Sequence, residues 1–107
     1  GTDELFTHAV GFLHQEYHNP ITISLLAAEC HCSESSLNHM LKKRLGVSMS
    51  TYVNKLRVER AKRYLLETDD SMLSIALSVG FRDANYFARV FRQLIGIQPS
   101  EFRRRYR

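Results

Sequence analysis

Apolar residues recur every three or four positions along almost the whole chain. This spacing places them on one face of an α-helix, so the sequence predicts helices and not strands. A first helix is expected to end before Asn19-Pro20, because the residue preceding a proline disfavours helical backbone. Thr22 or Ser24 is placed to cap a second, short helix, and Ser33 is placed to cap a third.

Gly46 is placed to end the third helix in left-handed backbone geometry. A longer helix is expected from about Ser50 to Glu67, followed by a polar break at residues 68–71 and a further helix. The inward positions expected on the first four helices are Leu5, Phe6, Ala9, Val10, Leu13, Tyr17, Ile23, Leu26, Ala27, Cys30, Leu37, Met40, Leu41, Leu45, Tyr52, Val53, Leu56, Ala61, Leu65 and Leu66.

The second half of the chain repeats the first, and such self-similarity constrains the fold. At an offset of 49, the residues Ile23, Leu26, Ala27 and Cys30 correspond to Met72, Ile75, Ala76 and Val79. Past the next turn the offset is 50, and Leu37, Met40, Leu41, Leu45 and Gly46 correspond to Phe87, Val90, Phe91, Ile95 and Gly96. Each copy reads as a short helix, a turn and a second helix, which is the pattern of a helix-turn-helix. The sequence therefore predicts an all-α fold.

A length of 107 residues suits one domain. We expect a first helix-turn-helix unit with its preceding helix over residues 1–49, a linker helix over 50–67 and a second unit over 68–107. The linker would be about 27 Å long. Successive major-groove faces on one side of B-DNA lie about 34 Å apart. Once the width of a helix is allowed for, the length of the linker is comparable to this groove spacing. The sequence therefore predicts that the second helices of the two units enter adjacent major grooves of one duplex.

Positive charge is concentrated in the second half of the chain. Residues 1–53 carry a net charge of −2, whereas residues 54–107 carry +6. Most of the second-half cations are arginines, whose planar guanidinium groups suit phosphates and guanine edges. The imbalance predicts binding to nucleic acid or to an anionic surface; ordinary solvated helix faces are the alternative.

The outward faces of the two second helices carry side chains that can read DNA. Asparagine pairs with adenine, arginine pairs with guanine, and a small side chain allows contact with a thymine methyl group. The predicted base-contacting residues are Ser35, Asn38, His39, Ala84, Asn85, Ala88 and Arg89. The predicted phosphate-contacting residues are Ser33, Lys42, Lys43, Arg82 and Arg92. The alternative is again that these are solvated helix faces.

Other chemistry is less well supported. Cys30-His31-Cys32 with His14 or His18 suggests zinc, but alternate residues of a short helix point to different sides and no second cysteine pair completes the ligands. We therefore expect Cys30 to be a packed thiol in a reducing, cytosolic protein. Neither a phosphate loop nor a nucleophile motif is present, so we expect no enzyme activity, metal or cofactor. The terminal arginines from Arg103 onwards are expected to be solvated, as a phosphate anchor or a flexible tail.

Two binding classes compete with DNA recognition. A protein-interaction module would present apolar residues on the outer faces of the second helices, where this sequence has polar and basic ones. A membrane-surface domain would combine tryptophan or phenylalanine with lysine on one face. Tryptophan is absent and the phenylalanines have core spacing, so no membrane partner is expected.

The second half also resembles a known family, the AraC/XylS transcription regulators of bacteria. The resemblance is carried by Ile75-Ala76, Gly80-Phe81, Asp83, Tyr86-Phe87, Arg89, Phe91-Arg92, Gly96, Pro99-Ser100 and Phe102-Arg103. Leu56-Arg57, Ala61 and Leu65-Leu66 match the family's linker helix, and Ala27, Ser33, Leu37, Lys42-Lys43 and Gly46 match its first unit. Cys30-His31-Cys32, His39 and Leu41 depart from the pattern, which bears on how tightly the first unit binds.

The resemblance implies a seven-helix domain with two recognition helices in adjacent major grooves of promoter DNA. It further implies contact with RNA polymerase, a role as an activator, with a repressor as the alternative, and a location in the bacterial cytoplasm at the nucleoid. Domains of this kind usually follow a separate sensor or dimerisation domain. Because the chain starts at Gly1-Thr2 without methionine, we expect a fragment of a longer protein, with a stand-alone regulator as the alternative.

Overall fold

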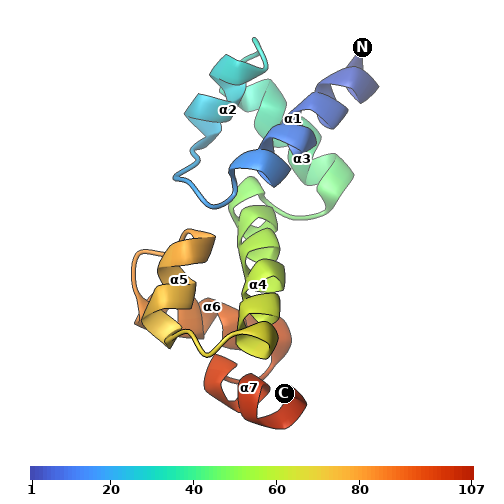
Figure 1. Cartoon of the computed structure of the whole chain (residues 1–107). Coiled ribbons are helices and arrows are strands. Elements are labelled where there is room, and N and C mark those ends of the chain that lie inside the picture. Colours follow the sequence, from blue (N-terminus) through green and yellow to red (C-terminus); the bar gives the residue numbers. More distant parts are fainter. The chain divides into compact units, whose positions relative to one another are not determined.

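The computed structural model describes all residues 1–107 and consists of seven α-helices without a β-strand (Figure 1). The helices are α1 (Thr2–Glu16), α2 (Ile23–Glu29), α3 (Glu34–Leu45), α4 (Met49–Glu67), α5 (Met72–Val79), α6 (Ala84–Ile95) and α7 (Pro99–Tyr106). This confirms the predicted all-α fold with seven helices. The chain forms two compact units, Gly1–Val53 and Asn54–Arg107, and the boundary between them falls inside α4.

Side-chain caps begin four of the helices, and two of these caps, Thr22 and Ser33, lie where the sequence predicts them. The hydroxyl oxygens of Thr22 and Ser33 accept hydrogen bonds from backbone N–H groups three residues later, at the starts of α2 and α3. Ser71 and Asp83 do the same for α5 and α6. Such bonds satisfy N–H groups that have no partner within the helix. Gly46 ends α3 with a left-handed φ of 78°, as predicted.

The first unit has an aliphatic core. Its buried residues are Ala9, Leu13, Leu26, Ala27, Leu37, Met40, Leu41, Met49 and Val53. His14 is exposed, and its Nε2 shares a hydrogen bond of 2.7 Å with the Tyr52 hydroxyl. This bond connects α1 to the first turns of α4.

The turn between α2 and α3 contains the only non-glycine residue with positive φ, His31 at 56°. Gly80 occupies the equivalent place in the second unit with a φ of 111°. In each turn the next residue donates a backbone hydrogen bond to the carbonyl five residues earlier, from Cys32 to Ala27 and from Phe81 to Ala76. Cys30 is only partly buried, so the prediction of a fully packed thiol is wrong. Val79, its equivalent, is completely buried.

The second unit has an aromatic core. Ring centroids lie 5.5 Å apart for Phe81 and Phe87, 5.8 Å for Phe87 and Phe91, and 5.5 Å for Phe91 and Phe102. These tilted and edge-on contacts add to the energy of burying the rings. Aliphatic residues of α4, α5 and α6 complete the cluster, namely Val58, Ala61, Leu65, Ile75, Ala76, Val79 and Val90.

One inward assignment on α4 is wrong. Leu66 has 36% of its surface exposed, whereas Leu65 is completely buried. The buried residues of α4 within the second unit are Val58, Ala61 and Leu65, at spacings of three and four. Leu66 lies one residue, or about 100°, beyond that line.

The C-terminal arginines are more ordered than a flexible tail. Arg103 lies within α7 and donates hydrogen bonds of 2.9 to 3.0 Å to the carbonyls of Leu65, Thr68 and Asp70. Arg107 donates to the same Thr68 carbonyl and pairs with Asp69. The expectation of a wholly solvated cluster is therefore wrong, because the end of α4 offers carbonyl groups that need donors.

Replacing Phe91 with alanine should lower the free energy of unfolding by about 3–5 kcal/mol, because the ring is completely buried between two others. Denaturant unfolding followed by circular dichroism measures this loss. Leu77→Ala is the control, since Leu77 is 54% exposed and its change should lie within about 0.5 kcal/mol. Equal effects of the two substitutions would contradict the inward assignment of Phe91.

Candidate nucleic-acid interface

Helix α6 has one buried face and one polar face. Phe87, Val90 and Phe91 are buried against the core of the second unit. Asn85, Arg89 and Arg92 are exposed, whereas Ala84 and Ala88 are partly buried. Because a helix repeats every 3.6 residues, burial of the aromatic face directs the polar residues outward. The structure thus brings Asn85, Ala88, Arg89 and Arg92 together on one surface. Ala84 is the first residue of α6, and Arg82 is exposed in the turn before it.

The first residues of α6 are held by Asp83. Its Oδ1 accepts a 2.7 Å hydrogen bond from the backbone N–H of Tyr86. Glu101 forms a 2.5 Å ion pair with Arg105 and none with Arg89. Arg89 has no hydrogen bond or ion pair within the protein, so its guanidinium group is available to a ligand.

Helix α3 presents the equivalent surface in the first unit. Leu37, Met40 and Leu41 are buried. The predicted contact residues of α3 are all exposed, namely Ser35, Asn38, His39, Lys42 and Lys43. Ser33 caps the helix by accepting from the Ser36 N–H at 3.1 Å, which leaves its hydroxyl proton free to be donated.

The cations of the chain divide into those with a partner in the protein and those without. Those that form an ion pair, a hydrogen bond or a contact with a ring are Arg44, Arg57, Arg60, Lys62, Arg63, Arg103, Arg105 and Arg107. Those without are Lys42, Lys43, Lys55, Arg82, Arg89, Arg92 and Arg104. Every cation predicted to contact DNA belongs to the second set.

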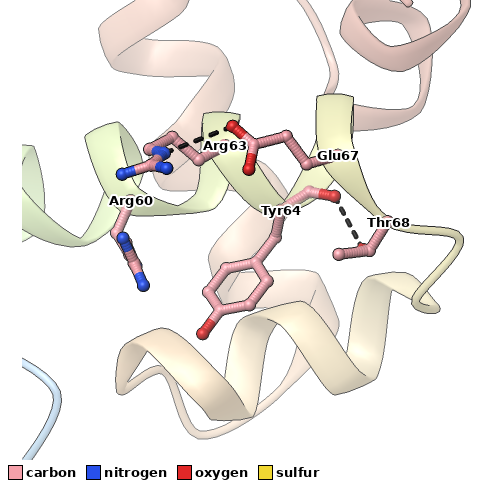
Figure 2. A pocket seen from close by; sticks show the side chains of 5 residues that line it. All are labelled: Arg60, Arg63, Tyr64, Glu67 and Thr68. Carbon is pink, nitrogen blue, oxygen red and sulfur yellow. Dashed lines mark hydrogen bonds and ion pairs between the residues drawn. The ribbon is translucent and has the colours of Figure 1, made fainter.

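Cations near the end of α4 illustrate the first set. Arg63 pairs with Glu67 at 3.3 Å, and the Arg60 guanidinium lies 5.4 Å from the centre of the Tyr64 ring (Figure 2). Thr68 donates from its hydroxyl to the Tyr64 carbonyl at 2.7 Å. The pocket among these residues has a volume of only about 80 Å³. Contacts within the protein therefore account for the positions of these side chains.

Arg57 supports the turn of the second unit from α4. Its guanidinium lies 5.5 Å from the centre of the Phe81 ring, and Phe81 contacts Tyr86 edge-on. Burial lowers the pKa of Arg57, and Tyr86 acts in the opposite direction. An arginine keeps its proton despite such effects, so the charge stabilises the turn that precedes α6.

The cysteines do not form part of a metal centre. No group of three or more histidine, cysteine or acidic side chains is arranged to hold an ion. Burial raises the pKa of Cys30, and the neighbouring Cys32 raises it further. A raised pKa favours the neutral thiol over the thiolate that binds metals. None of the seven helices combines the length and the apolar character that crossing a bilayer requires.

The polar surface of α6 extends further than the sequence predicted. A hollow of about 610 Å³ is lined by Asn85, Ala88, Arg89, Arg92, Gln93 and Gln98. Gln93 follows Arg89 by four residues, so helical spacing alone contained the signal for it. Gln98 lies at the start of α7, and only the turn at Gly96 places it beside α6.

Comparison with known proteins identifies the family of the domain. Residues 26–105 match a family described as a helix-turn-helix domain. The transcriptional activator RhaS of Escherichia fergusonii is 32% identical over 102 residues, which are 95% of this chain and 37% of RhaS. The chain thus spans about a third of the length of such curated relatives.

Solved structures show the same fold. An AraC-type transcriptional regulator from Chromobacterium violaceum has a TM-score of 0.88 and 29% identity, covering 97% of this chain and 93% of that one. The DNA-binding domain of the global transcriptional factor AdpA, solved with a target DNA, has a TM-score of 0.88 and 25% identity over 94% of this chain and 91% of that one. Both structures come from transcription regulators. The chain belongs to the AraC-type family of helix-turn-helix domains, the DNA-binding domains of transcription regulators.

Proposed function

We propose that the outward faces of α3 and α6 read DNA bases. The base contacts come from Ser35, Asn38, His39, Ala84, Asn85, Ala88 and Arg89, and the phosphate contacts from Ser33, Lys42, Lys43, Arg82 and Arg92. The observation that carries this proposal is the exposed polar face of α6, whose cations have no partner in the protein. Elsewhere in the second unit most cations are bonded internally.

We further propose that the two units act as one DNA-binding domain over residues 1–107, with α3 and α6 in adjacent major grooves. Continuity of α4 across the boundary between the units supports this, because a 19-residue helix is about 28 Å long. Adjacent grooves on one side of the duplex are about 34 Å apart.

The biological setting is also a proposal. The chain would be part of a longer bacterial regulator with a sensor or dimerisation domain, since it spans a third of its relatives. A role as an activator that contacts RNA polymerase is supported by the similarity to RhaS, and places the protein in the cytoplasm at the nucleoid.

The rival proposal of a protein-interaction module at α3 and α6 has less support. The large apolar residues that are exposed include Leu25 on α2 and Leu73 and Leu77 on α5. On α6 only Tyr86 is of this kind, and α3 has none. The predicted reading faces are therefore polar in the structure.

Selection from a random duplex pool should yield a preferred site whose binding depends steeply on salt. If six to eight phosphates are neutralised, log affinity should fall against log salt with a slope of about −5 to −7. Affinity measured between low and physiological salt gives this slope. Failure to enrich any sequence, or a flat titration, would contradict DNA binding as proposed.

Arg89 and Arg92 should behave differently when each is replaced by alanine. Arg89→Ala should lose about 1–3 kcal/mol on the preferred site and relax the preference at one base pair. Arg92→Ala should weaken all sequences equally and reduce the salt slope by about one. Binding to single-base variants of the site separates the two, and equal losses of Arg89→Ala on every variant would refute base reading by Arg89.

Inserting about five base pairs between the two half-sites should abolish specific binding, because half a helical turn moves one half-site to the opposite side of the duplex. Footprinting and affinity measurements on the extended site test this. An insertion of a full helical turn is the matched control, because it increases the distance between the half-sites and leaves both on the same side of the duplex. Unchanged affinity after the five-base-pair insertion would mean that only one unit reads bases.

A further inference from the structure

We infer that Gln93 and Gln98 form a second contact region of the second unit, donating hydrogen bonds from their side-chain amides to the DNA backbone beside the groove that α6 enters. The inference rests on the proposed function and assigns two residues outside the recognition face predicted from the repeat. It also assigns a ligand to the hollow between α6 and the start of α7.

The hollow brings together residues from two helices. Gln93 lies four residues after Arg89 and eight after Asn85, so the three form one row along α6. Gln98 precedes Pro99, the first residue of α7, and borders the same hollow. The left-handed backbone of Gly96, with a φ of 99°, turns the chain so that the two elements adjoin.

Both amides are available to a ligand. Gln98 is the capping residue of α7, but its side chain makes no capping hydrogen bond. Gln93 is exposed and bonds to no other side chain. The remaining polar residues of the hollow, Asn85, Arg89 and Arg92, likewise have no partner in the protein. A surface with this many unused donors suits a ligand rich in acceptor oxygens.

The lining of the hollow favours DNA as its occupant, with the sugar-phosphate backbone beside Gln93 and Gln98. It contains two arginines and three amides and no acidic residue, with Ala88 as its small apolar member. Gln93 lies about 6 Å further along the helix axis than Arg89, away from the N-terminal residues that reach base edges. Amide groups are common donors to phosphate oxygens and position a protein on the duplex.

A neutral donor leaves a signature that differs from that of a cation. Losing an amide removes one hydrogen bond but releases no counterion, so the salt slope should not change. Gln93→Ala and Gln98→Ala are therefore expected to weaken binding about 3- to 10-fold on every sequence at unchanged slope. Arg92→Ala, in the same hollow, provides the contrast because it should change the slope.

The experiment measures the affinity of the wild-type chain and both variants for the selected duplex, its single-base variants and a series with single methylphosphonate substitutions. At the contacted phosphate, the methylphosphonate should weaken the wild type and remove its advantage over Gln98→Ala. Gln15→Ala is the matched control, because Gln15 is an exposed glutamine of α1 and belongs to neither the α2–α3 pair nor the α5–α6 pair. The affinity of this variant should match that of the wild type. Circular dichroism verifies that each variant is folded.

Binding of both glutamine variants within twofold of the wild type would overturn the inference while leaving the proposed function intact. A loss confined to one base position would overturn the assignment to the backbone, since it would indicate base reading. Absence of specific binding by the wild type would instead refute the proposed function itself. The two failures are therefore distinguishable.

Discussion

Burial of one face of α6 is the constraint on which the rest of the site depends. Phe87 and Phe91 are completely buried, and their rings contact Phe81 and Phe102 from neighbouring elements. Rotation of the helix would expose these rings to water at a cost of about 1.5–3 kcal/mol each. The direction of Asn85 and Arg89 is therefore fixed by residues that never meet the ligand, and a base reader needs such a fixed direction to discriminate between bases.

The two units bury the inner faces of their helices with different residues. The first uses an aliphatic core and offers Ser35, Asn38 and His39 outward, with lysines behind them. The second uses aromatic rings in tilted and edge-on contact and offers arginines. The planar guanidinium group of arginine matches guanine and phosphate with a rigid pair of donors, whereas the lysine ammonium group is a compact charge on a flexible stem. On our account the second unit supplies the larger share of both affinity and base discrimination.

Much of this fold is predictable from sequence, because helical periodicity and short-range capping are local properties. The caps at Ser33 and Gly46 and the buried faces of α3 and α6 follow from spacing alone. The spacing pattern does not separate Leu66 from Leu65, because an apolar residue beside a buried one satisfies the pattern without lying on the packed face. The contacts of Arg103 and Gln98 depend on which helix ends meet in space, so no local pattern identifies them. The hydrogen bond of His14 to Tyr52 likewise joins residues that are distant in the sequence.

The central claim is that duplex DNA contacts the outward faces of α3 and α6. Nuclear magnetic resonance of the chain, titrated with its selected duplex, tests this claim most directly by following backbone amides and arginine side chains together. The account predicts the largest changes at Asn38, His39, Asn85 and Arg89, and little change at Leu73 and Leu77 of α5. Changes centred on α5 or on the internally bonded Arg103, with the two reading faces unaffected, would contradict it.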